Sequence, residues 1–260
     1  MTATFWNAWF GHQASRRLAR HIVPYIRRNQ EIWGETVEKH LGPQVRWLDA
    51  GCGWRILDDG LESLEDRLAD MTKFVVGIDL DFPHLRKHRN FSRRVLGSLD
   101  AIPLADASFD LITCNMVVEH LADPAPIFRE MTRALAPGGR IMLHTPNTWN
   151  YLVFAGRAAK TILPRSVILK LINDGRANDD IFPTFYRANS PRALRDLGHD
   201  LNLNVESMRV LTHPRPYTRS FAPVALFELL VMRATTSPSF ERFGTTIMTV
   251  YRKPMRVQSA

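Results

Sequence analysis

Short apolar runs alternate with amphipathic stretches between residues 45 and 145 of this 260-residue chain. The runs at residues 45–48 and 74–78 are apolar except for Arg46, and an aspartate follows each of them. Such runs are typical of parallel strands buried on both faces. Two later segments, at 204–211 and 245–251, fit further strands. The pattern therefore predicts an α/β sheet with two late strands.

Helical periodicity appears on both sides of this region. Leu18, Ile22 and Ile26 recur at helical spacing, and Pro24 interrupts the pattern, so residues 1–40 are expected to form divided helices. Asp123-Pro124 and Ser190-Pro191 each combine an N-cap residue with proline at the first turn, which predicts two helix starts. The apolar segment 221–232 is also predicted to be helical, and Pro137-Gly138-Gly139 is predicted to separate a helix from a strand at 140–144.

The turn after the first strand is the strongest candidate for a ligand site. Asp49 ends that strand, and Gly51 and Gly53 follow, so a ligand can approach the backbone closely. Asp79 ends the second strand, where its carboxylate could bind both hydroxyls of a ribose or could cap a helix. The glycines favour the ribose. Ile56 occupies the place of the third glycine of a dinucleotide fingerprint, which disfavours NAD or FAD.

Four segments, taken together, resemble the class I S-adenosylmethionine (SAM)-dependent methyltransferases over roughly residues 45–147. They are residues 48–53 (Leu-Asp-Ala-Gly-Cys-Gly), 76–79 (Val-Gly-Ile-Asp), 97–104 with 108–112, and 135–140 (Leu-Ala-Pro-Gly-Gly-Arg). The resemblance implies a Rossmann-like seven-stranded sheet in the order 3-2-1-4-5-7-6, with strand 7 antiparallel and helices on its flanks. It also implies an N-terminal helical lid at 1–40 and a SAM-binding domain at 41–260, with variable substrate-side insertions at 146–188 and 212–243.

The same resemblance implies a set of cofactor-binding residues. They are Asp49, Gly51, Cys52 and Gly53 at the methionine part, Asp79 at the ribose, Leu80, Ser98 and Leu99 around the adenine, and Asn115 at the methionyl end. Two positions depart from the family pattern: Arg55 replaces a glycine, and Ser98 replaces an aspartate. A serine hydroxyl can still accept a hydrogen bond, but without charge assistance.

Catalytic candidates follow the fourth and fifth strands. His120 and His144 could act as general bases, since an imidazole suits proton transfer near neutral pH, or could be structural. Metal-dependent relatives carry a carboxylate where Met116 stands, so no metal is expected. The residues that could line the substrate side, with packing or surface roles as the alternative, are Tyr151, Tyr186, Arg187 and His213. Trp6, Trp9 and Phe10 could wall the same pocket or pack the lid onto the core.

Composition and charge restrict the classes of partner that the protein is expected to bind. The net charge of +8 suits an acidic partner. The basic clusters at 16–28 and 86–94 do not interleave with aromatic residues as a base-stacking platform would, which disfavours nucleic acid as a ligand. An anionic small molecule or a peripheral membrane contact is favoured over it. No apolar run reaches membrane-spanning length, and the N-terminus lacks the pattern of a signal peptide. Cys52 and Cys114 are expected to be reduced thiols of a cytoplasmic protein.

The sequence thus predicts a methyltransferase that transfers a methyl group from SAM, with S-adenosylhomocysteine as product, to a small-molecule acceptor. O-methylation of a metabolite is the first choice, and N- or C-methylation stays open. An RNA methyltransferase and a degenerate SAM-binding protein are the alternatives. The apolar segment 221–232, with Phe240 and Phe243, could form an acceptor pocket, a surface for a lipid-linked acceptor, or a homodimer interface.

Overall fold

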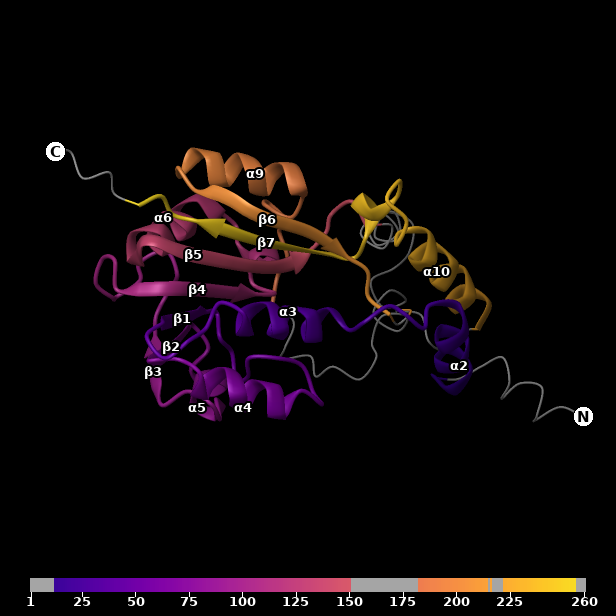
Figure 1. Ribbon diagram of the computed structural model, residues 1–260, viewed down its shortest axis with the longest axis horizontal. Coiled ribbons are helices and arrows are strands. Elements are labelled where there is room, and N and C mark those ends of the chain that lie inside the picture. Colours follow the sequence, from indigo (N-terminus) through magenta and orange to yellow (C-terminus); the bar gives the residue numbers. More distant parts are fainter. Residues whose placement is uncertain (1–11, 151–181, 215, 217–221, 256–260) are drawn as a thin grey trace, which may run out of the picture. The chain divides into compact units, whose positions relative to one another are not determined.

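A computed structural model describes residues 12–150, 182–214, 216 and 222–255 (Figure 1). These residues contain a seven-stranded sheet in the order β3-β2-β1-β4-β5-β7-β6. The strands are β1 (Arg46–Ala50), β2 (Phe74–Asp79), β3 (Arg93–Leu96), β4 (Phe109–Asn115), β5 (Leu135–Pro146), β6 (Asn204–Leu211) and β7 (Thr246–Arg252). Strands β1 to β5 pair in parallel. Strand β7 runs antiparallel, and just beyond it Lys253 exchanges backbone hydrogen bonds with Gly138 and Gly139. The predicted strand order is confirmed.

Strand β1 lies at the centre of the sheet and is buried on both faces. Trp47 and Leu48 are fully buried, as expected for a parallel strand covered by helices. Asp49 is in register with Gly77 of β2 and with Thr113 of β4. The carboxyl ends of β1, β2 and β4 therefore meet at one edge of the sheet, where ligands bind in open α/β folds.

The described helices are α2 (His12–Ile22), α3 (Asn29–Glu38), α4 (Glu62–Asp70), α5 (Phe82–Lys87), α6 (Pro124–Ala134), α9 (Pro191–Asp200) and α10 (Ala222–Ala234), with 3-10 turns η1 (Val118–His120) and η3 (Glu241–Phe243). The predicted N-caps are confirmed: Asp123 accepts from the backbone of Ala125, and Ser190 from that of Ala193. The N-cap of α5 is Asp81. Asp79 is therefore not the cap of this helix, which leaves the ligand role open to it.

Two predicted boundaries were wrong. Strand β5 begins at Leu135, directly after α6, instead of at residue 140. The stretch through Gly138 and Gly139 is an irregular part of the strand, because Leu135 pairs with Phe109 while Arg140 already pairs with Leu111. Gly138 adopts a φ of 79°, a left-handed conformation that glycine tolerates. Strand β7 is shifted by one residue, to Thr246–Arg252.

The chain divides into two compact units. One comprises residues 30–146, 184–209 and 247–260, and the other comprises 1–29, 147–183 and 210–246. In the second unit, α2 packs against α10, with Val23, just after α2, meeting Leu229 and Met232 in a buried cluster. The expected helix at 221–232 is therefore confirmed as α10, and the expected interruption near Pro24 falls between α2 and α3.

Candidate functional site

The turn after β1 has the geometry of a ligand cradle. Gly51 and Gly53 have φ values of 73° and 54°, which disfavour any side chain. The Gly51 backbone N–H donates to the carbonyl of Ile78 on β2 at 2.8 Å. A Cβ on Gly51 would lie 2.5 Å from Val117, whereas a Cβ on Gly53 would meet no heavy atom within 4 Å. Gly51 is therefore required for packing, and Gly53 leaves open space above the turn.

Asp79 is held by backbone donors beside this turn. One carboxylate oxygen accepts from the N–H of Gly53 at 2.7 Å, and the other accepts from the N–H of Asp81 at 2.8 Å. Each carboxylate oxygen can accept more than one hydrogen bond, so both can also receive hydroxyl groups. The side chain is half-buried and fixed in orientation, as the binding of a ribose diol requires.

Asp49 is a strongly perturbed carboxyl group of the site. Its carboxylate is buried and accepts from the Thr113 hydroxyl at 2.6 Å, while Thr113 in turn accepts from the indole N–H of Trp47 at 2.7 Å. Burial raises the pKa of Asp49 to about 7, the Thr113 hydrogen bond partly offsets this, and the charges of Asp79 and Glu65 raise the pKa further. A positively charged ligand would relieve the repulsion among these carboxylates.

Glu65 of α4 binds the loop that follows this turn. Its carboxylate accepts from the backbone N–H of Leu57 at 2.6 Å, and burial raises its pKa. The two bulky residues of the loop, Trp54 and Arg55, stack on each other with the guanidinium carbon 4.2 Å from the ring centroid. Arg55 also pairs with Asp59. The arginine that replaces a family glycine is thereby held by contacts within its own loop.

Asn115, at the end of β4, belongs to a polar network that the sequence pattern did not indicate. Its amide N–H donates to Gln30 at 2.9 Å and to the Ile56 carbonyl at 3.2 Å, so its carbonyl oxygen is the acceptor for Gln30 at 3.2 Å and for His144 at 2.9 Å. His144 therefore carries its proton on Nδ1. It is 1% exposed and stacks on Trp33. His144 orients Asn115 from the interior.

His120 has a different environment. It ends η1 with a side chain that is 32% exposed, and its Nε2 lies 3.9 Å from a carboxylate oxygen of Glu119. Glu119 is buried and accepts from the Thr145 hydroxyl at 3.0 Å, and burial raises its pKa. The Glu119 carbonyl also accepts from the N–H of Tyr186 at 3.2 Å. Tyr186 has a φ of 53°, a conformation uncommon for a bulky residue outside functional or turn sites.

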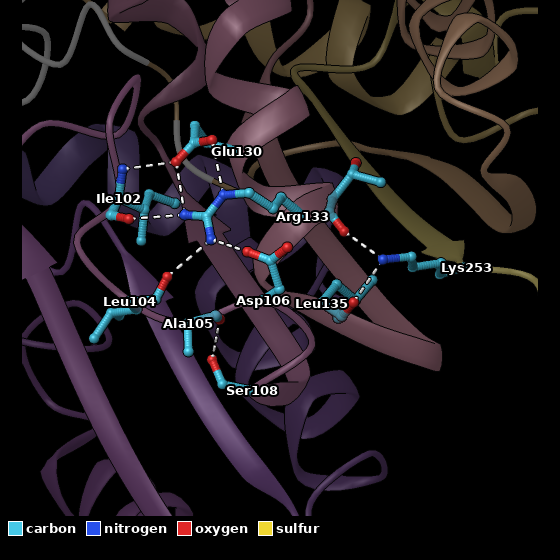
Figure 2. A network of polar contacts seen from close by, with 10 residues as sticks. Ile102, Leu104, Ala105, Asp106, Ser108, Glu130, Arg133, Leu135 and Lys253 are labelled. Carbon is cyan, nitrogen blue, oxygen red and sulfur yellow. Dashed lines mark hydrogen bonds and ion pairs between the residues drawn. The ribbon is translucent and has the colours of Figure 1, made fainter.

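Ser98 and Leu99 precede a loop that α6 holds firmly (Figure 2). The Arg133 guanidinium donates to the carbonyls of Ile102 at 2.8 Å and Leu104 at 2.9 Å, and it pairs with Glu130 and Asp106. Glu130 also accepts from the N–H of Ile102 at 3.0 Å. Because both backbone groups of Ile102 are bound to α6, the loop after Ser98 and Leu99 has a defined conformation.

The remaining predicted residues are distributed as follows. Leu80 is 70% exposed, Leu99 is buried and Ser98 is half-buried. Arg187 is exposed in the larger unit. His213 belongs to the smaller unit, where its N–H donates to the Thr245 hydroxyl at 2.8 Å. Tyr151 and the aromatic residues Trp6, Trp9 and Phe10 lie outside the described residues.

Neither cysteine has the environment of a reactive group. Cys52 and Cys114 are free buried thiols, and burial raises the pKa of both well above the ordinary range. The Cys52 sulfur lies next to Gly77 and donates to the carbonyl of Gly53 at 3.8 Å. Within the described residues, no group of three or more His, Cys, Asp or Glu side chains is placed to hold a metal ion.

A largely parallel sheet with a glycine turn after β1 and a carboxylate at the end of β2 is typical of nucleoside-binding α/β proteins. Residues 48–143 match the family model described as a methyltransferase domain. The chain is 34% identical over 126 residues to a probable SAM-dependent methyltransferase of Mycolicibacterium smegmatis, covering 47% of this chain and 46% of that one. It is 37% identical over 108 residues to a ubiquinone biosynthesis O-methyltransferase of Idiomarina loihiensis, covering 38% and 42%.

Solved structures agree on the fold. A SAM-dependent methyltransferase of Methanosarcina mazei superposes with a TM-score of 0.56 at 16% identity, covering 85% of this chain and 98% of that one. The chain spans about half the length of the curated relatives it matches. The similarity in sequence is thus to a methyltransferase domain over residues 48–143, and the solved structures show the same fold.

Proposed function

We propose that the protein transfers the methyl group of SAM to a small-molecule acceptor, with O-methylation of a metabolite as the preferred reaction. The observation that carries this proposal is the arrangement of Gly53 and Asp79. The Gly53 N–H orients the carboxylate, and the space above Gly53 is open. A nucleoside can lie on the turn with its ribose on Asp79.

The residues present fit SAM at both ends. Bound SAM supplies an activated methyl group on a sulfonium. The carboxylates of Asp49, Asp79 and Glu65 suit its positive charge, and Leu80 and Leu99 offer apolar contacts for the adenine. Asn115, fixed by Gln30 and His144, would present its amide to the methionyl end. Alignment and exclusion of water are then the main contributions of the protein.

Of the two histidine candidates, the exposed one is better placed to meet an acceptor. His144 is buried and bonded to Asn115, which supports a positioning role. His120 is partly exposed beside the buried carboxyl of Glu119, which would stabilise an imidazolium formed by proton transfer from a hydroxyl. Tyr186, tied to Glu119 through its backbone, and exposed Arg187 are the candidate acceptor contacts in the same unit.

Oxygen is the preferred target because two matched relatives are named as O-methyltransferases, of ubiquinone biosynthesis and of malonyl-acyl-carrier protein. The test is to incubate the protein with SAM and separate panels of phenols, carboxylic acids and amines, and to quantify S-adenosylhomocysteine. Turnover with phenols or carboxylic acids, lost in Asp79→Ala and reduced in His120→Gln, is the expected result. Turnover with amines alone would contradict O-methylation.

RNA is the rival acceptor. A total RNA panel in the same assay, with salt varied, separates the two, because phosphate contacts make RNA binding strongly salt-dependent. Methylation of RNA that falls steeply with salt would replace the small-molecule proposal. SAM binding without turnover on any panel would favour a degenerate SAM-binding protein.

A further inference from the structure

Helix α10 is apolar on both of its sides. Its inner side packs with α2, and the buried residues there include Ala225, Leu229 and Met232 (Figure 1). Its outer side carries large apolar residues that are exposed by 38–63%, namely Leu226, Phe227 and Leu230. Positions 226, 227 and 230 share one side of a helix by their spacing. These three residues are called the apolar face of α10.

Exposed arginines occur on α10 and in the segment that follows it. Arg233 is exposed and comes seven residues after Leu226 and three after Leu230, which places it on the same side of the helix. Arg242 is also exposed and follows two residues after Phe240, an aromatic residue that is 52% exposed. The acid of α10, Glu228, is buried and so adds no negative charge to the exposed surface.

The described part of the smaller unit has a strong positive excess. It contains seven arginines and two glutamates, namely Arg16, Arg17, Arg20, Arg27, Arg28, Arg233 and Arg242 against Glu228 and Glu241. This charge decides between possible occupants of the apolar face. Two copies of the chain packed through it would bring like charges together, whereas an anionic surface would satisfy both the arginines and the apolar side chains.

The length of α10 further restricts the occupant. The helix has 13 residues, and a bilayer-spanning helix needs about 20. None of the helices among the described residues combines the length and apolarity needed to cross a membrane. A short helix with an apolar face and bordering arginines can instead lie in the plane of the headgroups.

We infer that the apolar face of α10 docks on an anionic lipid bilayer. Leu226, Phe227 and Leu230 enter the boundary between headgroups and acyl chains, and Arg233 and Arg242 contact the lipid phosphates. This surface belongs to the smaller unit and the glycine turn to the larger one, and its test does not depend on methyl transfer.

The first experiment measures binding of the full chain to vesicles by cosedimentation. Vesicles of phosphatidylcholine alone are compared with equal parts of phosphatidylcholine and phosphatidylglycerol. Phe227→Gln/Leu230→Gln should lower partitioning onto the anionic vesicles about tenfold or more, because two half-exposed apolar side chains are no longer transferred from water into the bilayer. The matched control is Leu96→Gln, a leucine that is 56% exposed on β3 in the other unit, and it should bind like the wild type.

The second experiment separates a local role of charge from general attraction. Arg233→Gln/Arg242→Gln should weaken binding to the anionic vesicles about fivefold or more, since each arginine near the surface contributes about that factor. Arg86→Gln/Lys87→Gln removes the same charge from α5 in the other unit and should change binding less than twofold. Circular dichroism and melting temperature verify that all variants are folded.

Three results would overturn the inference. The wild type could fail to bind anionic vesicles at low salt. The two charge pairs could lose binding equally, which would indicate unspecific attraction. The chain could instead form a dimer that Phe227→Gln/Leu230→Gln dissociates, without vesicle binding, which would identify a second copy as the occupant.

Discussion

The raised pKa of Asp49 predicts that SAM binds more tightly as pH rises through neutrality. Asp49 is buried under the glycine turn, and its pKa is about 7. Only the ionised carboxylate favours the sulfonium and ammonium groups of SAM, so the apparent Kd is the intrinsic Kd divided by the ionised fraction. That fraction rises from roughly one tenth at pH 6 to roughly nine tenths at pH 8, so the Kd should fall about tenfold.

The assay is calorimetric titration with SAM at pH 6, 7 and 8, in two buffers with different ionisation enthalpies. At pH 7, binding should release about half a proton. Asp49→Asn keeps an oxygen that can accept from Thr113 but has no charge to titrate. Its SAM affinity should be lower and independent of pH. The reasoning would be refuted by a constant wild-type affinity, or by the same pH dependence in Asp49→Asn.

The same carboxyl also affects stability, with a definite sign. Because its folded pKa of about 7 exceeds its unfolded value of 3.8, the folded state holds its proton more tightly. Its contribution to stability is fully present below pH 4 and is lost as pH rises towards 7. The loss is roughly 1.4 kcal/mol for each pH unit, or about 4 kcal/mol in total. Asp49→Asn should therefore be more stable than the wild type at pH 8 in urea unfolding.

Three further predictions concern the turn, a buried histidine and the α6 clamp. Gly53→Ala should still fold, with a loss of about 1–2 kcal/mol of stability because of its positive φ, but it should lose SAM binding in titration. Gly51→Ala should lower the melting temperature further, because its added methyl group meets Val117. Burial, and secondarily Arg94, lowers the pKa of His88 to about 4, so the contribution of His88 to stability should decrease by about 3 kcal/mol as pH falls from 6.5 to 4. Urea unfolding should show this as a decrease in the stability of the wild type relative to His88→Phe over the same range. Arg133→Gln should raise the KM for SAM more than it lowers kcat. It should also lower the local stability of residues 101–108 by about 2 kcal/mol and so speed their amide exchange. The control is Arg129→Gln, an exposed position on the same helix.

Each of these has a clear contrary result. Normal SAM affinity in Gly53→Ala would mean that no ligand lies over that turn. A stability difference between wild type and His88→Phe that stays constant between pH 4 and 6.5 would mean that His88 is solvated in solution. An Arg133→Gln variant with unchanged exchange in the loop would show that other contacts hold it.

Much of the larger unit could be predicted from the sequence because its signals are local. An aspartate that ends an apolar run, followed by glycines, needs only neighbouring residues to be interpreted, and Asp49, Gly51 and Gly53 lie where expected. The strand order came from the family resemblance and was confirmed. The Asp-Pro and Ser-Pro helix starts follow from capping chemistry.

The features that could not be predicted depend on distant contacts. Gln30 pairs with Asn115 across 85 positions of sequence, and no local pattern indicates such a pair. The start of β5 was missed because Pro137-Gly138-Gly139 resembles a turn, while the structure accommodates it as a strand irregularity. The exposed side of α10 was undecidable, because a helix that is apolar all round does not show which side is covered.

The central claim is that the turn at Gly51 and Gly53, with Asp79, binds SAM. The most direct test is calorimetric titration of the purified chain with SAM and with S-adenosylhomocysteine, repeated with Asp79→Ala. The account predicts micromolar binding of both ligands, lost in the variant while its melting temperature stays close to that of the wild type. Absence of binding to folded, ligand-free protein, or equal binding by Asp79→Ala, would contradict it.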